Sequence, residues 1–274
     1  MKLGFLLGYS GKQINIPLDL IRQAESMGYD SVWTAEAYGN DAVTAATWVL
    51  AQTEKIRVGT AIMQMPARTP AMCAMTAMSL DQLSGGRFIV GLGASGPQVV
   101  EGWHGVPYGK PVTRTKEYIK IMRAIMEREG PVEFDGQIYQ LPNKGEGTTG
   151  LGKPLKSILE CSPDIPIYTA SITPAGLRCA GEVADGVFPV WMDPNKYDVI
   201  GEHIGTGLEK SGRTLADFDI APFVSVAMND DMDAAFDSLR PWLALYIGGM
   251  GAKGKNFYND YATRLGYGCL LYTS

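Results

Sequence analysis

Polar residues follow several short apolar runs of the sequence, and their types indicate what chemistry they could support. Glu36 follows the second run, with Tyr38 beside it, and Gln64 follows the third. A carboxylate, an amide and aromatic rings on an otherwise apolar rim suit a bound redox cofactor better than side-chain acid–base chemistry. The alternative is that Glu36 is a solvated loop charge and that Asp41 caps the helix that follows.

Two further turns contain residues suited to ligand binding. Ala94 and Ser95 follow the fourth run, and their small size lets a ligand approach the backbone. Thr173 can cap a helix that starts near Pro174, and the free N–H groups at such a start can bind an anion. Trp191 follows the sixth run and places an indole at the same rim. An ordinary glycine turn and an ordinary capped helix are the alternatives.

Other classes of site are disfavoured by residue type and charge. The two histidines, His104 and His203, belong to no Ser-His-Asp arrangement, and no Walker loop is present. The four cysteines are scattered, so we expect neither a disulfide framework nor a metal site. The net charge of −5 offers no basic surface for nucleic acid. No apolar run is long enough to span a bilayer and no signal peptide is recognisable, so we expect a cytoplasmic protein.

Short apolar runs alternate with helical patterns along the whole chain. The expected strands are 2–7, 31–34, 56–63, 88–92, 167–170, 186–190 and 220–228. The expected helices are 16–27, 41–52, 70–83, 114–128, 174–184, 196–211 and 232–246. This alternation predicts an α/β fold of the (β/α)8 TIM-barrel type, in which reactive groups follow the strands. An open doubly wound sheet is the competing fold, but residues 8–11 lack its G-x-G-x-x-G turn.

The length and the repeat count predict one barrel domain over residues 1–274. A long insertion interrupts it at about 94–165, and its Gly/Pro-rich stretch favours a lid or substrate loop over a disordered insertion. Only seven strand–helix units are found, so the barrel is expected to be truncated before its last unit. Residues 268–274 break the helical pattern, and we expect them to be a non-native tail.

Three segments, in order, resemble signatures of the bacterial luciferase-like superfamily. They are GYDSVWTAEA at 28–37, LDQLSGGRFIVGLG at 80–93 and AGEVADGV at 180–187. The resemblance covers residues 1–267 and implies a luciferase-like barrel. GASGPQVVEGW at 93–103 resembles the branch that uses the deazaflavin coenzyme F420, and the monooxygenases that use flavin mononucleotide (FMN) are the rival assignment.

The resemblance also implies positions for the site. Carried over by position, the cofactor contacts are Glu36, Ala61, Ile62, Gln64, Ala94, Ser95, Ile172, Thr173, Ala175 and Gly176. Residues 172–176 would take the coenzyme phosphate, and a non-proline cis peptide at Ala61–Ile62 would back the ring. We expect Glu36 to face the barrel mouth and to find donors on Gln64, on nearby backbone or on the coenzyme. The expected substrate contacts are Tyr38, Trp103 and Trp191.

The chain departs from the sugar-phosphate dehydrogenase branch at two positions. Ala37 stands where that branch has a histidine, and Gly96 stands where it has a catalytic glutamate, so sugar-phosphate oxidation is not expected. Tyr38, Glu101 or His104 could replace these proton-transfer groups, and the sequence selects none of them.

The resemblance and the residues together predict an oxidoreductase that transfers a hydride between F420 and an unidentified small organic substrate. An FMN-dependent luciferase-like monooxygenase and a coenzyme-binding barrel without turnover are the alternatives. We further expect a homodimer that has no nucleic-acid or membrane partner.

Overall fold

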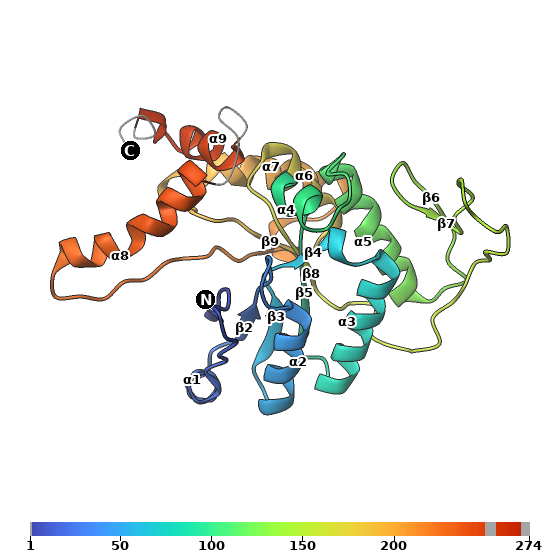
Figure 1. Ribbon diagram of the computed structural model, residues 1–274, viewed down its shortest axis with the longest axis horizontal. Coiled ribbons are helices and arrows are strands. Elements are labelled where there is room, and N and C mark those ends of the chain that lie inside the picture. Colours follow the sequence, from blue (N-terminus) through green and yellow to red (C-terminus); the bar gives the residue numbers. More distant parts are fainter. Residues whose placement is uncertain (1, 250–255, 270–274) are drawn as a thin grey trace. The chain divides into compact units, whose positions relative to one another are not determined.

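The computed structural model describes residues 2–249 and 256–269. The chain divides into two compact units, the first made of Met1–Ala170 and Val183–Gly186 and the second of Ser171–Glu182 and Val187–Ser274. Strands and helices alternate along both units, as the sequence predicts (Figure 1). No helix among the described residues is both long and apolar enough to cross a membrane.

The first unit contains most of the strands. Its strands are β1 (Gly4–Leu6), β2 (Ser31–Thr34), β3 (Arg57–Thr60), β4 (Met63–Gln64), β5 (Phe88–Gly93) and β8 (Ile167–Ala170), with a separate hairpin of β6 (Phe134–Asp135) and β7 (Gln140–Leu141). Its helices are α1 (Leu18–Ser26), α2 (Ala42–Gln52), α3 (Pro70–Ser84), α4 (Pro97–Gly102) and α5 (Pro111–Glu127).

The strands of the first unit pair in the order of the sequence. β1, β2, β3, β5 and β8 follow one another with β4 beside β5, and these pairs are parallel. A doubly wound sheet reverses its strand order at a switch point, whereas a barrel adds strands in sequence. The order within this unit therefore favours the predicted barrel topology over the open sheet.

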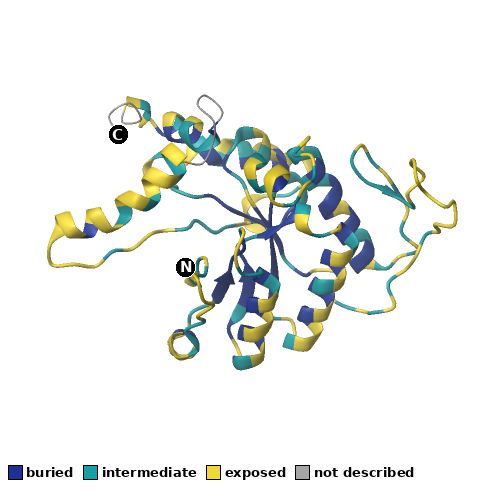
Figure 2. Ribbon diagram, viewed as in Figure 1, coloured by how far each residue is buried: buried dark blue, intermediate teal, exposed yellow. Residues whose placement is uncertain are grey.

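The central strands are buried on both faces. Val32, Val58 and Val90, from β2, β3 and β5, are fully buried, and Figure 2 shows these strands in dark blue. Helices α2 and α3 expose one side to solvent, where Figure 2 turns yellow, and bury the other. Strands covered on both faces need apolar residues at successive positions, which explains why these sequences do not alternate.

Trp33 fills space between neighbouring strands because two of its neighbours are glycines. A Cβ atom on Gly59 of β3 would lie 2.2 Å from the Trp33 ring, and one on Gly4 of β1 would lie 2.8 Å from its Nε1. The ring also packs against Tyr168 of β8, with centroids 5.9 Å apart. Large and small residues thus alternate across the sheet to fill it without voids.

Local capping explains where the helices next to the site begin. Asp41 accepts a hydrogen bond from the Thr44 amide at 2.6 Å and starts α2. Thr69 caps α3 by accepting from the Met72 amide at 3.2 Å, and Gly85 ends that helix at φ 68°. These are the usual signals for helix starts and stops, so both helices lie close to their predicted ranges.

Several predicted strands are shorter in the structure. The strands expected at 2–7 and 186–190 are trimmed to Gly4–Leu6 and Gly186–Phe188, and two others change more. The strand expected at 56–63 divides into β3 and β4, with a cis peptide bond between Ala61 and Ile62. The strand expected at 220–228 is reduced to β10 (Asp219–Ile220), followed by one bridge between Val190 and Phe223. An apolar run predicts strand conformation but does not supply a partner strand. Beyond β10, the amides of Ala221 and Phe223 still donate to the carbonyl oxygens of Val187 and Pro189, at 2.9 and 3.3 Å.

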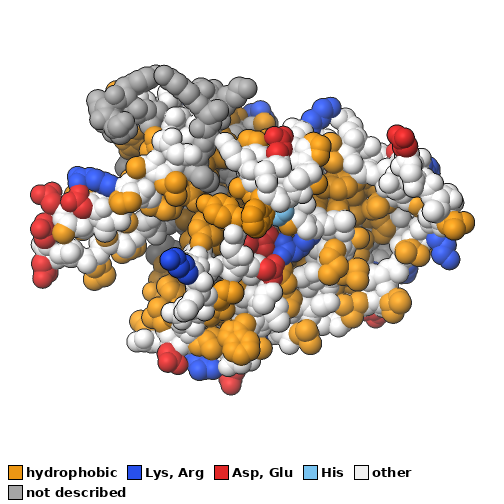
Figure 3. All heavy atoms as spheres, viewed as in Figure 1, with side chains coloured by type: hydrophobic (Ala, Val, Ile, Leu, Met, Phe, Trp, Pro, Cys, Tyr) orange, Lys and Arg blue, Asp and Glu red, His pale blue; other side chains and the backbone are white. Residues whose placement is uncertain are grey.

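The second unit consists mainly of helices. It contains α6 (Pro174–Val183), β9 (Gly186–Phe188), α7 (Asp198–Lys210), β10, α8 (Met232–Ala244) and α9 (Phe257–Arg264). Helices α6 and α7 cross at glycines, because a Cβ atom on Gly207 would lie 2.1 Å from the Arg178 carbonyl oxygen. Acidic side chains gather over the start of α8 (Figure 3), where they suit the positive end of the helix dipole.

The end of the chain is described up to Cys269. Tyr267 donates a hydrogen bond to Asp193 at 3.1 Å, so the chain up to that residue is part of the second unit. Residues 270–274 of the expected tail lie outside the described residues.

The segment expected as an insertion contains α4, α5 and the β6–β7 hairpin. One buried carboxylate anchors the hairpin to α5: Glu117 accepts from the amides of Gln137, Ile138 and Tyr139 at 2.7, 2.9 and 3.0 Å. A carboxylate that accepts several backbone N–H groups is strongly stabilised in its charged form.

We predict that E117Q loosens this hairpin locally. Hydrogen exchange of the amides of residues 137–139 should accelerate by about tenfold, since a hydrogen bond to a charged group contributes about 1.5–3 kcal/mol. E127Q, at an exposed position of the same helix, is the matched control and should leave those amides unchanged. Equal exchange in both variants would show that Glu117 is not the anchor.

Candidate functional site

A buried carboxylate lies beyond the carboxyl end of β2. Glu36 is only 8% exposed, and its two oxygens accept from the amides of Ala42 at 3.0 Å and Gln64 at 2.7 Å. Arg68 completes the set by donating to both oxygens, at 2.6 and 3.0 Å. The expected donors on Gln64 and nearby backbone are therefore present, and Glu36 is not a solvated loop charge.

Arg68 connects two acidic residues. It also pairs with Asp41, the cap of α2. Burial alone would raise the pKa of Asp41, but hydrogen bonds from Thr44 and the charge of Arg68 lower it below its ordinary value. Burial likewise opposes the charge of Arg68, but Glu36 and Asp41 raise its pKa. Sequence reasoning missed this role, although an arginine in an apolar turn after a buried acid was a usable signal.

Gln64 is held at both ends of its side-chain amide. This residue is 2% exposed, and its Nε2 donates to the Ala37 carbonyl oxygen at 2.5 Å. Its Oε1 lies 3.0 Å from Nε2 of His104, which follows α4. The structure thus brings His104 to a predicted cofactor contact, which the sequence could not select.

The turns after β3 and β5 pack closely against each other. The cis peptide at Ala61–Ile62 is at the position that the family resemblance implies. The Ile62 side chain rests on Gly93, where a Cβ atom would lie 2.5 Å from its Cδ1. Ser95 has φ 60°, a left-handed conformation that non-glycine residues seldom adopt and that is common at functional turns.

The predicted phosphate turn lies in the second unit, at the start of α6. Thr173 caps the helix, as predicted, by accepting from the Gly176 amide at 3.1 Å. Arg264 of α9 donates to the Ile172 carbonyl oxygen at 2.5 Å. Its Nη1 is buried, and in the described part of the chain it meets no hydrogen-bond partner. Arg264 was missed by sequence reasoning because α9 is distant in sequence from this turn.

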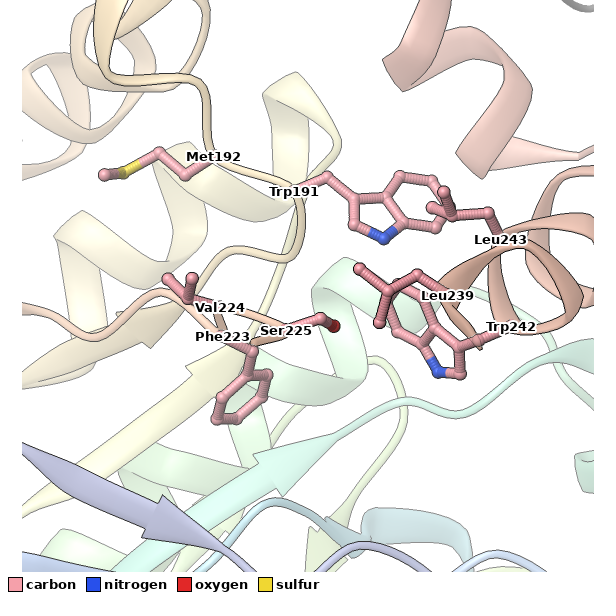
Figure 4. A pocket seen from close by; sticks show the side chains of 8 residues that line it. All are labelled: Trp191, Met192, Phe223, Val224, Ser225, Leu239, Trp242 and Leu243. Atoms are coloured by element: carbon pink, nitrogen blue, oxygen red, sulfur yellow. The ribbon is translucent and has the colours of Figure 1, made fainter. Parts of the chain in front are cut away.

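Trp191 lines a pocket of about 180 Å³ in the second unit. The lining residues are Trp191, Met192, Phe223, Val224, Ser225, Leu239, Trp242 and Leu243, and Figure 4 shows the Phe223–Ser225 segment facing the side chains of α8. Trp191 has φ 50° and packs edge-on against Trp242, with centroids 5.6 Å apart. Its Nε1 is buried without a partner among the described residues.

The other two expected substrate contacts lie at the surface of the first unit. Tyr38 is 68% exposed and Trp103 is 66% exposed. Their contact with a substrate stays a prediction.

Thiol chemistry is disfavoured at this site. Cys73 of α3 is fully buried, and burial raises its pKa to about 11, so it carries no thiolate at neutral pH. Within residues 2–249 and 256–269, no three Cys, His, Asp or Glu side chains gather as a metal centre would require.

We predict that E36Q lowers the free energy of unfolding by about 3 kcal/mol, because removing one partner of a buried ion pair leaves the other charge uncompensated. The control is E160Q, which breaks a pair of 2.8 Å between Arg128 and a carboxylate that is 80% exposed. E160Q should lower the free energy of unfolding, measured by urea denaturation, by less than about 1 kcal/mol. Similar small losses in both variants would contradict a structural role for the Glu36 network.

Comparison of the sequence with those of known proteins identifies related oxidoreductases. A protein of Mycobacterium tuberculosis classed as a coenzyme F420-dependent oxidoreductase is 47% identical over 97% of this chain and 78% of its own length. The 5,10-methylenetetrahydromethanopterin reductase of Archaeoglobus fulgidus is 30% identical over 84% of this chain, which spans 65% of that reductase.

Solved structures agree on the fold. The F420-dependent tetrahydromethanopterin reductase of Methanopyrus kandleri superposes with a TM-score of 0.74 at 24% identity, over 97% of this chain and 82% of that one. The sequence model of the luciferase-like monooxygenases matches residues 5–270. The resemblance seen in the three sequence signatures is therefore confirmed, and the chain belongs to the luciferase-like monooxygenase family.

Proposed function

We propose that the protein is an oxidoreductase that transfers a hydride between the deazaflavin coenzyme F420 and a small organic substrate. The observation that carries this proposal is the 47% identity, over nearly the whole chain, to the mycobacterial protein classed as F420-dependent. The M. kandleri reductase, whose fold the chain shares, is also F420-dependent. The single barrel domain over residues 1–274 stays a prediction.

The first unit offers groups that fit a polar-edged ring. Thr169 at the end of β8 is 2% exposed, and its hydroxyl has no hydrogen-bond partner within the described residues. Ala94 is small and only partly buried, and Ile62, which covers Gly93, provides an apolar surface. A buried hydroxyl without a partner costs free energy, so a ligand that hydrogen-bonds to it would be stabilised there.

The second unit offers groups that fit an anionic tail. The start of α6 presents its first amides, including that of Ala175, and the positive end of a helix dipole favours phosphate. The unpaired Arg264 Nη1 adds a fixed positive charge beside Ile172. We propose that these groups take the phosphate of F420.

The protein's part in the reaction is binding and orientation. When bound, F420 supplies the ring carbon that accepts or donates hydride. Protein donors occupy both oxygens of Glu36, so we propose that this residue acts chiefly by fixing Gln64 and Arg68. Its direct contact with the coenzyme stays a prediction.

Some parts of the sequence-based prediction stay open. An FMN-dependent monooxygenase and a barrel without turnover are the alternatives that the binding experiment below addresses. The homodimer, the cytoplasmic location, the truncated last barrel unit and the non-native tail stay predictions.

We predict that the purified protein binds F420 with a dissociation constant in the micromolar range or below, and FMN at least about tenfold more weakly. R264Q should weaken F420 binding by roughly tenfold to a hundredfold, the worth of a hydrogen bond to a charged group. Coenzyme fluorescence measures both, and circular dichroism checks that the variant is folded.

The matched control is R240Q, which removes an exposed arginine of the same unit and should bind F420 like the unmodified protein. Tighter binding of FMN than of F420 would favour the monooxygenase alternative. Unchanged F420 binding in folded R264Q would remove Arg264 from the phosphate site.

A further inference from the structure

His104 is hydrogen-bonded to Gln64, a buried residue of the candidate site. Its Nε2 lies 3.0 Å from Oε1 of Gln64, whose backbone amide in turn donates to Glu36 at 2.7 Å. The histidine lies in the loop after β5, and Gln64 ends β4, so both belong to the end of the parallel strands where barrel enzymes bind ligands. The ring itself is partly exposed.

The hydrogen bonds of Gln64 determine which nitrogen of His104 carries the proton. The Gln64 amide nitrogen donates to the Ala37 carbonyl oxygen, so the amide oxygen is the atom that faces the imidazole. An amide oxygen only accepts, and His104 Nε2 must therefore donate. In the neutral ring, this leaves Nδ1 unprotonated and able to accept a proton.

The other two residues that could transfer a proton are less well placed. The Tyr38 side chain is 68% exposed and has no hydrogen bond among the contacts described for it. Glu101 is exposed on α4, and its carboxylate accepts from the Tyr108 amide at 3.2 Å. Of the three, only His104 is held by a buried residue of the candidate site.

We propose that His104 is the proton-transfer residue of the reaction, acting through Nδ1 on a substrate oxygen. In the oxidising direction, the substrate carbon would give its hydride, with two electrons, to F420, while the hydroxyl proton passes to Nδ1 and the C–O bond becomes a carbonyl. The reverse reaction returns the proton to the oxygen. This assignment rests on the proposed function for its hydride acceptor. His104 would take over the proton transfer for which the sugar-phosphate dehydrogenase branch has a histidine and a glutamate, at the positions of Ala37 and Gly96.

The tautomer can be tested directly because the chain has only two histidines. Nitrogen-15 NMR at a pH where the ring is neutral should show His104 protonated at Nε2 and bare at Nδ1, with H104Q providing the assignment. Q64L removes the acceptor and should give a mixture of tautomers at His104, while His203 keeps its signals. A proton on Nδ1 of His104 in the unmodified protein would overturn the proposal.

The position of Nδ1 relative to the coenzyme is tested by chemical modification. Diethyl pyrocarbonate acylates unprotonated imidazole nitrogens, and saturating F420 should slow its reaction at His104 at least about tenfold. His203, whose Nδ1 lies 3.3 Å from Arg178 on the exposed side of α7, is the internal control and should react equally with and without F420.

Three outcomes separate the proposals. If F420 binds but leaves His104 equally reactive, His104 does not face the coenzyme and the proposal fails alone. If H104Q loses about tenfold or more in F420 affinity, the residue is a coenzyme contact, which also contradicts the proposal, since we expect affinity within about twofold. If F420 does not bind the unmodified protein at all, the proposed function fails, and this assignment fails with it.

Discussion

The burial of the Glu36 carboxylate constrains the rest of the candidate site. A carboxylate that is 8% exposed must be surrounded by donors, because an unpaired buried charge costs several kcal/mol. Its donors come from three separate segments, at Ala42, Gln64 and Arg68. The start of α2, the end of β4 and the turn before α3 must therefore converge on the residue that follows β2.

This convergence fixes the groups that could meet a ligand. The backbone of Gln64 is held by Glu36, so its side chain can lie between the Ala37 carbonyl oxygen and His104. On the other side of that residue, the bend at Ala61–Ile62 lets Ile62 cover Gly93. The buried Glu36 carboxylate thus fixes the backbone at Gln64. The polar contact of Gln64 with His104 and the apolar contact of Ile62 with Gly93 lie on either side of this point.

The sequence predicted those features that depend on local patterns. The apolar runs located β2, β3, β5 and β8, because strands buried on both faces need continuous apolar residues. Caps at Asp41 and Thr69 matched their helices. The burial of Glu36 and the cis peptide came from the family resemblance, which encodes positions that pattern alone cannot.

The features that the sequence missed all depend on contacts between distant residues. Arg68 meets Glu36 across 32 positions, His104 meets Gln64 across 40, and Arg264 meets Ile172 across 92. The hydrophobic periodicity of a sequence reports local secondary structure and contains no information about such pairs. The residues after β10 show the converse, since their apolar run is a local pattern that does not supply a partner strand.

In the part of the chain that the structure describes, each unit contains buried polar side-chain atoms that meet no hydrogen-bond partner, both neutral and cationic. In the described part of the first unit, the buried Thr169 hydroxyl is neutral, and the bare Nδ1 inferred for His104 is neutral as well. In the described part of the second unit, Arg264 leaves a cationic N–H unpaired beside the turn that starts α6. Groups that the protein does not satisfy itself are those that a ligand stabilises most, because each unmade hydrogen bond carries a full desolvation cost. A ligand group that accepts or donates a hydrogen bond would satisfy the Thr169 hydroxyl of the first unit, and an anion would satisfy the Arg264 N–H of the second.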